Sequence, residues 1–373
     1  MNYPDFETES YFGKYEFTKP YMLSASDCES ISTSELIELG GGSLEEFGKV
    51  KLDYPSMEGS LQLRTLISKT YEDVGSDQVL ILGSPIEGIY LSTQAMLEIG
   101  DHAIVLSPAY DALFNMVQAL TGNVSRWMLK AEDGAWKLDF EELHRLINSK
   151  TKLLILNFPH NPTGFLPRKE DFLKLTAIAK KHGIFIFSDE MYRGLEYNLE
   201  FQLPSVADLE MSAITLGGVS KNLGLPGLRF GWLVCKDENI YKKLLNMKSY
   251  ISMCSPQTLD YLGQMAMKAY PRLVQKNILL INENLKLAQL YFNSKKNQMR
   301  FLAPMAGSVA LFKLPNGSAE KFCLEMAENH GIVLLPAKFM GIADQYVRMG
   351  FGRKNFSLCF AKFVEVLDKV KFD

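Results

Sequence analysis

The sequence of 373 residues has a mass of 42.1 kDa, with 47% hydrophobic and 22% charged residues. These values are ordinary for a folded protein of two or three domains and exclude a disordered or fibrous chain. The net charge of −3 and the pI of about 6.1 argue against the basic surface of a nucleic-acid binder and the basic clusters that bind anionic membranes.

The sequence also predicts where the protein works. No apolar run reaches the ~18 residues of a membrane span, and the first ten residues lack the basic start and apolar stretch of a signal peptide. The cysteines are odd in number, scattered and without a C-x-x-C pair, which argues against a disulfide scaffold or a zinc site. We therefore expect a cytoplasmic protein with no metal centre. Its five cysteines are Cys28, Cys235, Cys254, Cys323 and Cys359.

Between about residues 79 and 235, short apolar runs alternate with amphipathic helical patterns. Strands joined by crossover helices predict a mostly parallel sheet that is covered on both faces. The predicted strands are 79–82, 103–106, 124–129, 152–157, 184–187, 213–216 and 230–234, and the predicted helices are 85–99, 110–120, 139–147 and 169–181.

Beyond this region the pattern changes. Residues 237–293 are predicted to be helical, with a break near Tyr270-Pro271. Residues 299–373 mix predicted strands (308–313, 332–335, 346–349) with predicted helices (318–329, 355–370), as in a smaller α+β domain, and the first 45 residues show no strong period. We expect an N-terminal arm that joins the small domain (1–45), a large domain (46–270) and a C-terminal small domain (271–373).

Polar residues follow several of the predicted strands, where ligands bind in such a sheet. Asp189 follows the strand 184–187. Such a carboxylate often only caps a helix. A metal site would need further ligands near Asp189, and the neighbouring sequence does not supply them. Buried beside a pyridine nitrogen, it would instead keep that nitrogen protonated and make the ring an electron sink. Tyr192 and Asn161 could both reach a phenolic oxygen of the same ring, although the segment around Asn161 is by composition simply a turn.

Lys221 lies in a glycine-rich loop after the predicted strand 213–216. Most lysines are solvated surface charges, but a desolvated lysine has a lowered pKa and can form a Schiff base. Arg229, at 229 − 221 = 8 residues further on, offers a planar guanidinium that suits phosphate. Gly83-Ser84 precedes a predicted helix N-terminus, another phosphate-binding device. Each loop thus suits one part of a phosphorylated pyridine aldehyde.

Together these segments resemble the class I and II aminotransferases, which are fold-type I pyridoxal-phosphate enzymes, over nearly the whole chain. The resemblance implies an α/β large domain with a mostly parallel sheet flanked by helices, and a smaller α+β domain built from the N- and C-terminal segments. It also implies pyridoxal 5'-phosphate as cofactor. It rests on an ordered set of motifs, Asn161-Pro-Thr-Gly164, Asp189-Glu-x-Tyr192, Ser220-Lys221 and Pro226-Gly-Leu-Arg229.

The resemblance implies a role for each matching residue. Lys221 holds the cofactor as a Schiff base and moves the proton, Asp189 pairs with the pyridine nitrogen, and Tyr110 stacks on the ring. The other matches are Asn161 and Tyr192 at the ring oxygen, Arg229, Ser84, Ile86 and Ser220 at the phosphate, and Arg348 with Asn161 at the substrate, where Arg348 grips the α-carboxylate.

One match concerns assembly, and two positions depart from the family. Tyr54 matches a tyrosine that reaches the phosphate of the neighbouring subunit, which implies a homodimer. Gly218 stands where the family usually has a hydroxyl residue for the phosphate, so Ser220 is our substitute. Pro85 in the phosphate turn cannot donate an N–H, so we take its neighbours Ser84 and Ile86 as donors.

The expected activity is transfer of an amino group between an α-amino acid and a 2-oxo acid. Elimination and ring closure also begin with deprotonation at Cα, so a pyridoxal-phosphate lyase, synthase or cyclase is the alternative. The chain lacks the G-x-G-x-x-G of a dehydrogenase, the K-T-G that accompanies S-x-x-K in acyl enzymes, and a basic N-terminal DNA-binding segment. Arg348 is the one arginine assigned to a carboxylate, which favours neutral or aromatic amino acids over aspartate.

Overall fold

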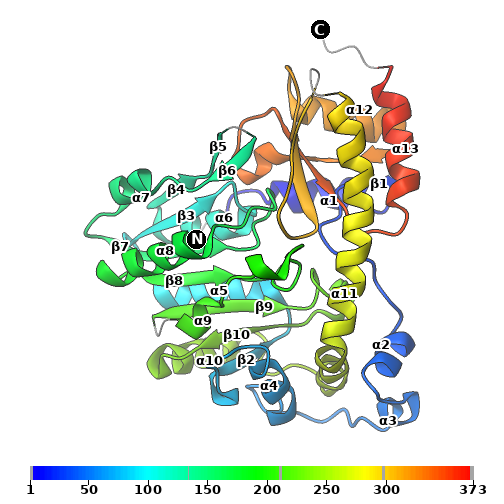
Figure 1. The fold of residues 1–373 in the computed structure, drawn as a ribbon. Coiled ribbons are helices and arrows are strands. Elements are labelled where there is room, and N and C mark those ends of the chain that lie inside the picture. The colour runs from blue at the N-terminus through cyan, green and yellow to red at the C-terminus, as the bar shows by residue number, and fades with distance from the viewer. Residues whose placement is uncertain (1–2, 133, 210–211, 296–298, 370–373) are drawn as a thin grey trace.

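The computed structural model describes residues 3–132, 134–209, 212–295 and 299–369. Its two main sheets lie in separate regions of the molecule (Figure 1). The seven-stranded sheet and its helices fill the lower part of the view, and the four-stranded sheet lies above it with helices α12 and α13. The long helix α11 (Gln257–Ser294) runs beside both regions.

The large sheet has the strand order β2, β10, β9, β8, β7, β3, β4. β10 is antiparallel to both of its neighbours and every other pair is parallel, which confirms the predicted mostly parallel sheet. β8 and β9 each extend two residues beyond their predicted ends. The strands are β2 (Val79–Leu82), β3 (His102–Ser107), β4 (Val124–Met128), β7 (Thr151–Asn157), β8 (Phe185–Asp189), β9 (Ala213–Gly218) and β10 (Gly231–Cys235).

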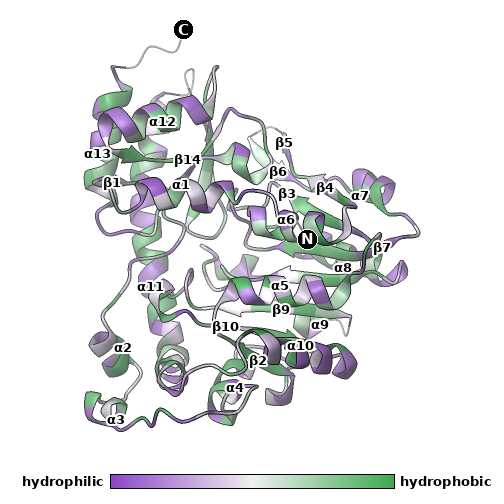
Figure 2. Ribbon diagram, turned by 180° about the vertical axis from the view of Figure 1, so that it is seen from behind, coloured by the Kyte–Doolittle hydropathy of each residue, from purple (hydrophilic) through white to green (hydrophobic). Residues whose placement is uncertain are grey.

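Helices cover both faces of this sheet. Alternate residues of a strand point to opposite faces, and both sets are apolar here, so each face packs against helices. Leu80 and Leu82 of β2 pack in one core cluster with α5, α6 and α10, whereas Val79 and Ile81 pack in another with α4 and α11. The strands of this sheet are coloured mostly as hydrophobic (Figure 2), as expected for a sheet that is covered on both faces. The flanking helices are α4 (Leu61–Ser68), α5 (Pro85–Met96), α6 (Asp111–Thr121), α7 (Phe140–Leu146), α8 (Lys169–Lys181), α9 (Val206–Leu209) and α10 (Glu238–Ile251).

The predicted break near Tyr270-Pro271 is wrong. Helix α11 continues through Pro271, and the break lies instead between α10 and α11. Met253 in that connection has a left-handed φ of 57°, which an α-helix does not contain. Ala269 and Leu273, on either side of Pro271, are buried in the core against β2 and β10. Tertiary packing therefore keeps α11 continuous despite the missing N–H.

The small sheet is antiparallel and has the order β11, β12, β15, β14. Ser318 caps the helix α12 by accepting from the N–H of Lys321, as the sequence indicated. The elements are β11 (Arg300–Leu302), β12 (Val309–Lys313), α12 (Ala319–His330), β13 (Ile332–Val333), β14 (Leu335–Pro336), β15 (Tyr346–Gly350) and α13 (Phe356–Leu367), and a separate hairpin consists of β5 (Lys130–Glu132) and β6 (Ala135–Lys137).

The first 45 residues are more structured than predicted. They contain α1 (Glu7–Tyr15), α2 (Thr33–Leu39), the start of α3 (Leu44–Gly48) and β1 (Tyr21–Met22), which pairs with β13. These elements are too short to show a strong period. Ser32-x-x-Glu35 and Ser43-x-x-Glu46 form capping boxes, a local signal that could have revealed the two helix starts.

Candidate active site

Asn161, Asp189 and Lys221 lie at or after the carboxyl ends of the neighbouring strands β7, β8 and β9. Arg348 of β15 contacts Asn161, and Ser26 of the N-terminal segment contacts Lys221. Seen from behind, α1 lies between the small sheet and α6 (Figure 2). The described residues contain no cluster of His, Cys, Asp or Glu arranged to bind a metal. They also contain no helix with the length and apolar character of a membrane span.

Lys221 follows β9 and is held by the segment around Ser26. Its Nζ donates to Ser26 Oγ at 2.8 Å, and its carbonyl accepts from the N–H of Cys28. Burial lowers the pKa of Lys221 and nearby Arg348 lowers it further, whereas the carboxylates of Asp27, Glu9 and Asp189 oppose the shift. A lowered pKa makes the neutral, nucleophilic amine easier to form.

Asp189 is the last residue of β8 and is only 7% exposed. Burial raises the pKa of its carboxyl to about 6, and Oδ1 accepts from the N–H of Met191 at 3.1 Å. Asn157 ends the neighbouring strand: its Nδ2 donates to the Asp189 carbonyl at 2.9 Å, and its Oδ1 accepts from the N–H of Asn161 at 2.8 Å. Asn157, which sequence reasoning missed, therefore joins the two predicted cofactor residues.

Arg348 brings the small sheet into the site. It lies inside β15 and is 1% exposed. Nη1 donates to Asn161 Oδ1 at 3.1 Å and Nη2 donates to the Ser24 carbonyl at 3.0 Å. Among the described residues, Arg348 Nε and the buried Tyr192 hydroxyl have no hydrogen-bond partner. Two polar groups thus remain available to a ligand.

Two of the predicted phosphate residues, Ser84 and Ile86, lie at the N-terminus of α5. Ser84 is its N-cap residue, but the Ser84 side chain makes no capping bond, and the N–H of Gly83 donates to Glu87 Oε2 at 2.9 Å. Ile86 lies in the first turn. A Cβ at Gly218 would lie 2.8 Å from Met191 Sδ and 3.1 Å from Pro85 Cγ. Glycine at 218 therefore lets the first turn of α5 approach β9.

Arg229 has a left-handed backbone with φ of 50° and an exposed side chain whose Nη1 donates to the Pro226 carbonyl at 3.0 Å. Such a backbone is strained for a residue with a Cβ and is common at functional sites. Ser220 is buried in the same loop. Tyr54 is 82% exposed and, among the described residues, lacks a hydrogen-bond partner. A single chain thus does not bring Tyr54 into contact with Lys221 or Arg229.

Tyr110 meets the N-terminal helix. Its hydroxyl donates to Glu9 Oε1 at 2.7 Å, and its ring centroid lies 5.4 Å from that of Phe6. Burial raises the pKa of the Tyr110 hydroxyl, so the hydroxyl stays neutral. The N-terminal segment also supplies Asp27, whose two oxygens accept from Arg353 Nη2 at 3.0 and 2.8 Å. No pattern in the sequence pointed to these contacts.

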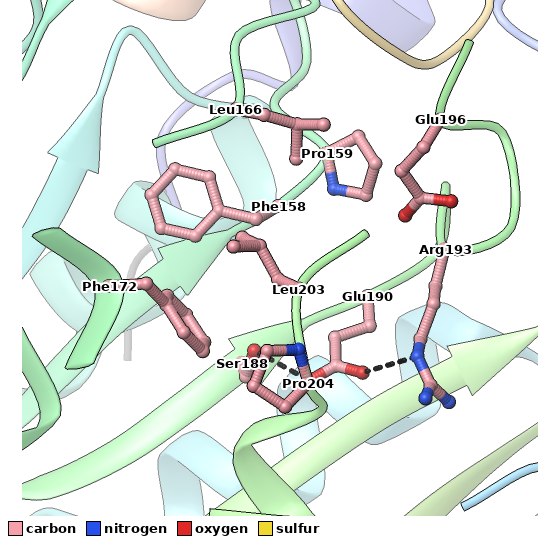
Figure 3. Close-up of a pocket in the computed structure, with 10 residues that line it drawn as sticks. All are labelled: Phe158, Pro159, Leu166, Phe172, Ser188, Glu190, Arg193, Glu196, Leu203 and Pro204. Carbon is pink, nitrogen blue, oxygen red and sulfur yellow. Dashed lines mark hydrogen bonds and ion pairs between the residues drawn. The ribbon is translucent and has the colours of Figure 1, made fainter. Parts of the chain in front are cut away.

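A small cavity lies next to Ser188 of β8 and Glu190 (Figure 3). Its volume of about 10 Å³ is room for about one water molecule. Glu190 Oε1 accepts from Ser188 Oγ and Ser205 Oγ at 3.1 and 3.0 Å, and Oε2 lies 3.8 Å from Arg193 Nε. This cavity is too small for an amino acid, and the Glu190–Arg193 ion pair that lines it is largely buried.

Known proteins are similar to this chain in sequence and fold. The sequence model of the family described as Aminotransferase class I and II matches residues 35–358. An aspartate aminotransferase of Thermotoga maritima is 26% identical over 335 residues, 87% of this chain and 83% of that protein. A capreomycidine synthase of Streptomyces vinaceus is 24% identical over 302 residues, 80% and 78% of the two chains.

The fold is also that of solved proteins. The crystal structure of a PLP-dependent aminotransferase from Streptococcus suis matches with a TM-score of 0.93, and the match covers 100% of each chain at 28% sequence identity.

Proposed function

The chain belongs to the class I and II aminotransferases, which use pyridoxal 5'-phosphate, and from this premise we propose that it moves an amino group from an α-amino acid to a 2-oxo acid. The observation that carries the proposal is the position of Lys221. Its amine follows β9 and donates to Ser26 Oγ at 2.8 Å, and Asp189 and Arg348 are close enough to affect its pKa.

The residues of the pocket fit this cofactor. Buried polar atoms without partners, Arg348 Nε and the Tyr192 hydroxyl, are costly unless a ligand satisfies them. When bound, the cofactor supplies an electron sink for the charge that develops at Cα. We assign its phosphate to Arg229, Ser84, Ile86 and Ser220, its ring oxygen to Asn161 and Tyr192, its ring face to Tyr110 and its ring nitrogen to Asp189.

Lys221 has two tasks in this proposal. Its Nζ would hold the cofactor covalently, and as a free amine it would accept the proton that leaves Cα of the substrate. The lowered pKa of Lys221 favours the neutral amine, which is the form that accepts a proton. Ser26 Oγ, 2.8 Å from Nζ, orients the amine.

Arg348 binds the substrate α-carboxylate in this proposal. Asn161 and Ser24 hold one nitrogen each of the guanidinium, which fixes its plane before substrate arrives. A fixed, buried guanidinium suits a bidentate contact with a carboxylate. The substrate is thereby oriented with Cα toward Lys221.

A second candidate function has its own support. The capreomycidine synthase of Streptomyces vinaceus, named as a synthase, aligns with 80% of this chain. Because the residues around Lys221 act on Cα in either case, the cofactor pocket alone does not separate transamination from elimination or ring closure. The reaction products therefore distinguish transamination from elimination or ring closure.

We also propose that the enzyme is a homodimer in the cytoplasm. Large apolar side chains that a single chain leaves exposed support the dimer: Leu52, Tyr54 and Tyr250 are 89%, 82% and 87% exposed. Five unpaired thiols support a reducing compartment.

The test uses purified enzyme with a panel of α-amino acids, each with and without a 2-oxo acid. A keto-acid product that requires the 2-oxo acid supports transamination, and ammonia released without it supports the lyase alternative. Borohydride should fix the cofactor on the peptide that contains Lys221. Lys221→Ala should lose both the label and turnover, whereas Lys49→Ala, which changes an exposed lysine, should keep both. A label on another lysine would overturn the assignment.

A further inference from the structure

Arg193 contacts the residues that directly follow Asp189 and Lys221 in the sequence, which are Glu190 and Asn222. Arg193 Nε lies 3.8 Å from Glu190 Oε2, and the Arg193 carbonyl accepts from Asn222 Nδ2 at 2.9 Å. Arg193 therefore connects the end of β8 with the loop after β9.

Arg193 and Asn222 are also held by more distant parts of the chain. Arg193 Nη1 donates to the Thr70 carbonyl at 2.9 Å, and Asn277 Nδ2 of α11 donates to the Asn222 carbonyl at 2.9 Å. Glu190 and Asn222 are both buried. The positions of these side chains are thus fixed by the surrounding fold.

One buried polar atom of each of these three residues lacks a hydrogen-bond partner within the described parts of the chain. These atoms are Glu190 Oε2, Arg193 Nε and Asn222 Oδ1. The 3.8 Å between Nε and Oε2 is too long for a direct hydrogen bond. Buried polar atoms are costly unless they are paired, so the three atoms together indicate a small polar ligand.

The same three residues line a second small cavity, which shares Glu190 and Arg193 with the cavity of Figure 3. Its volume of about 10 Å³ admits about one water molecule. The hydrogen-bond pattern also suits water, which can accept from Nε–H and donate one hydrogen each to Oε2 and Oδ1. The other lining residues are Thr70, Tyr71, Gly217, Gly218, Trp232 and Tyr270.

We propose, resting on the proposed function, that Glu190, Arg193 and Asn222 bind one ordered water, which joins the neighbours of Asp189 and Lys221 and fixes the separation of these two groups. A bridging water holds two polar groups nearly as well as a direct hydrogen bond. The three residues are positioning residues, because they act through Asp189 and Lys221. A displacement of about 1 Å at a reacting group can lower a rate by about 100-fold.

A crystal structure of the cofactor-loaded enzyme tests the water site directly. We expect a density peak within about 3.2 Å of Glu190 Oε2, Arg193 Nε and Asn222 Oδ1. A cavity without such a peak, or a direct bond between Nε and Oε2, would overturn the water site.

Arg193→Met tests the positioning role, because methionine lacks the Nε donor. At saturating cofactor we expect kcat to fall by about 10–100-fold, with little change in KM for the amino acid because Arg348 is unaltered. The pH titration of the bound cofactor's absorbance should shift its midpoint. In the cofactor-free protein, the pH dependence of Lys221 acylation, followed by mass spectrometry, should shift as well.

Arg64→Met is the matched control. Arg64 is also largely buried: its Nη1 donates to the Ser76 carbonyl at 2.7 Å, and its Nη2 lies 3.4 Å from Glu58 Oε2. This variant should lose stability but keep kcat and both midpoints. If Arg193→Met does not fold, Glu190→Gln replaces it. Since Oε1 accepts three hydrogen bonds, the new amide nitrogen takes the place of the acceptor Oε2.

The outcomes separate this proposal from the proposed function. Normal kcat with unshifted midpoints in Arg193→Met or its replacement, or equal changes in Arg64→Met, overturn the positioning role. A chain that binds the cofactor but forms no keto acid with any amino acid overturns the proposed activity. In that case the crystal structure and the acylation of Lys221 in the cofactor-free protein still decide the water site and the positioning role.

Discussion

At the scale of single residues, burial gives Lys221 and Asp189 their chemistry. Burial lowers the pKa of the lysine and raises that of the aspartate to about 6. Both shifts favour the neutral form, because a charge in a dry pocket loses its hydration. With a pKa of about 6, the Asp189 carboxyl is still mostly ionised at neutral pH, and a protonated ring nitrogen beside it would stabilise that charge further.

Asp189→Ala should fail mainly in chemistry. A well-placed electrostatic group in a dry site contributes on the order of 10²–10³ in kcat, so we expect at least that loss, with a smaller loss in cofactor binding. Stopped-flow turnover and an absorbance titration measure the two effects separately. Near-normal turnover would show that Asp189 is only a structural carboxylate.

Asp189 should also shape stability against pH. A raised carboxyl pKa means that the folded chain binds the proton more tightly than the unfolded chain. In the cofactor-free protein, this contribution to the free energy of unfolding is present below pH 3.8 and is lost as the pH rises through about 6. Across that window, the wild type should lose stability relative to Asp189→Asn in denaturant unfolding.

The stability of the wild type is compared with that of a variant because Glu196 is a second buried carboxyl with a raised pKa. Burial raises its pKa to about 6 as well, but its contribution is present in both proteins and cancels in the difference. If the free energies of unfolding of the wild type and of Asp189→Asn changed equally with pH, Asp189 would not have the raised pKa.

At the scale of elements, the segment 23–28 docks on the end of β15 and carries Ser26 to Lys221. The N–H of Gly350 donates to the Leu23 carbonyl at 2.8 Å, and a Cβ at 350 would overlap the Ala25 carbonyl oxygen. Close contact between the two backbones therefore requires glycine at this position.

Gly350→Ala should displace this segment. Overpacking typically costs about 1–3 kcal/mol, so we expect a loss of that size in the free energy of unfolding, together with a higher KM for the amino acid. Gly13→Ala in α1 is the control, since a Cβ there meets no atom within 4 Å and alanine favours a helix. A fully stable Gly350→Ala with normal KM would refute the docking argument.

At the scale of the whole molecule, shared sites follow from the proposed dimer. Tyr54 is assigned to the partner's phosphate, so each site would need Lys221 and Arg229 from one chain and Tyr54 from the other. The loss of one hydrogen bond to a charged group costs about 1.5–3 kcal/mol. Tyr54→Phe should therefore retain the cofactor less tightly without losing its fold, as equilibrium dialysis would measure.

Mixing variants tests the sharing directly. In a Lys221→Ala and Tyr54→Phe heterodimer, one site carries both changes and the other carries neither, so the mixture should exceed the average activity of the two parents. A monomer in solution with full turnover would contradict the shared site. The division into segments 1–45, 46–270 and 271–373 also stays a prediction.

The sequence by itself determined the parallel sheet and the loops that bear the site. Apolar periodicity located every strand of the large sheet, and α8 was predicted with its observed bounds, 169–181. Polar residues after parallel strands must meet at one edge of the sheet, which is why Asp189, Asn161 and Lys221 could be chosen without a structure.

Only the tertiary structure decided what faces those residues. Asp27 pairs with Arg353 across 326 positions and Tyr110 with Glu9 across 101, and no local pattern encodes contacts between such distant segments. The continuous helix through Pro271 was likewise decided by its buried neighbours. Periodicity follows from the geometry of single elements, whereas the groups that the N-terminal segment brings to Lys221 and Tyr110 depend on how that segment docks against both sheets.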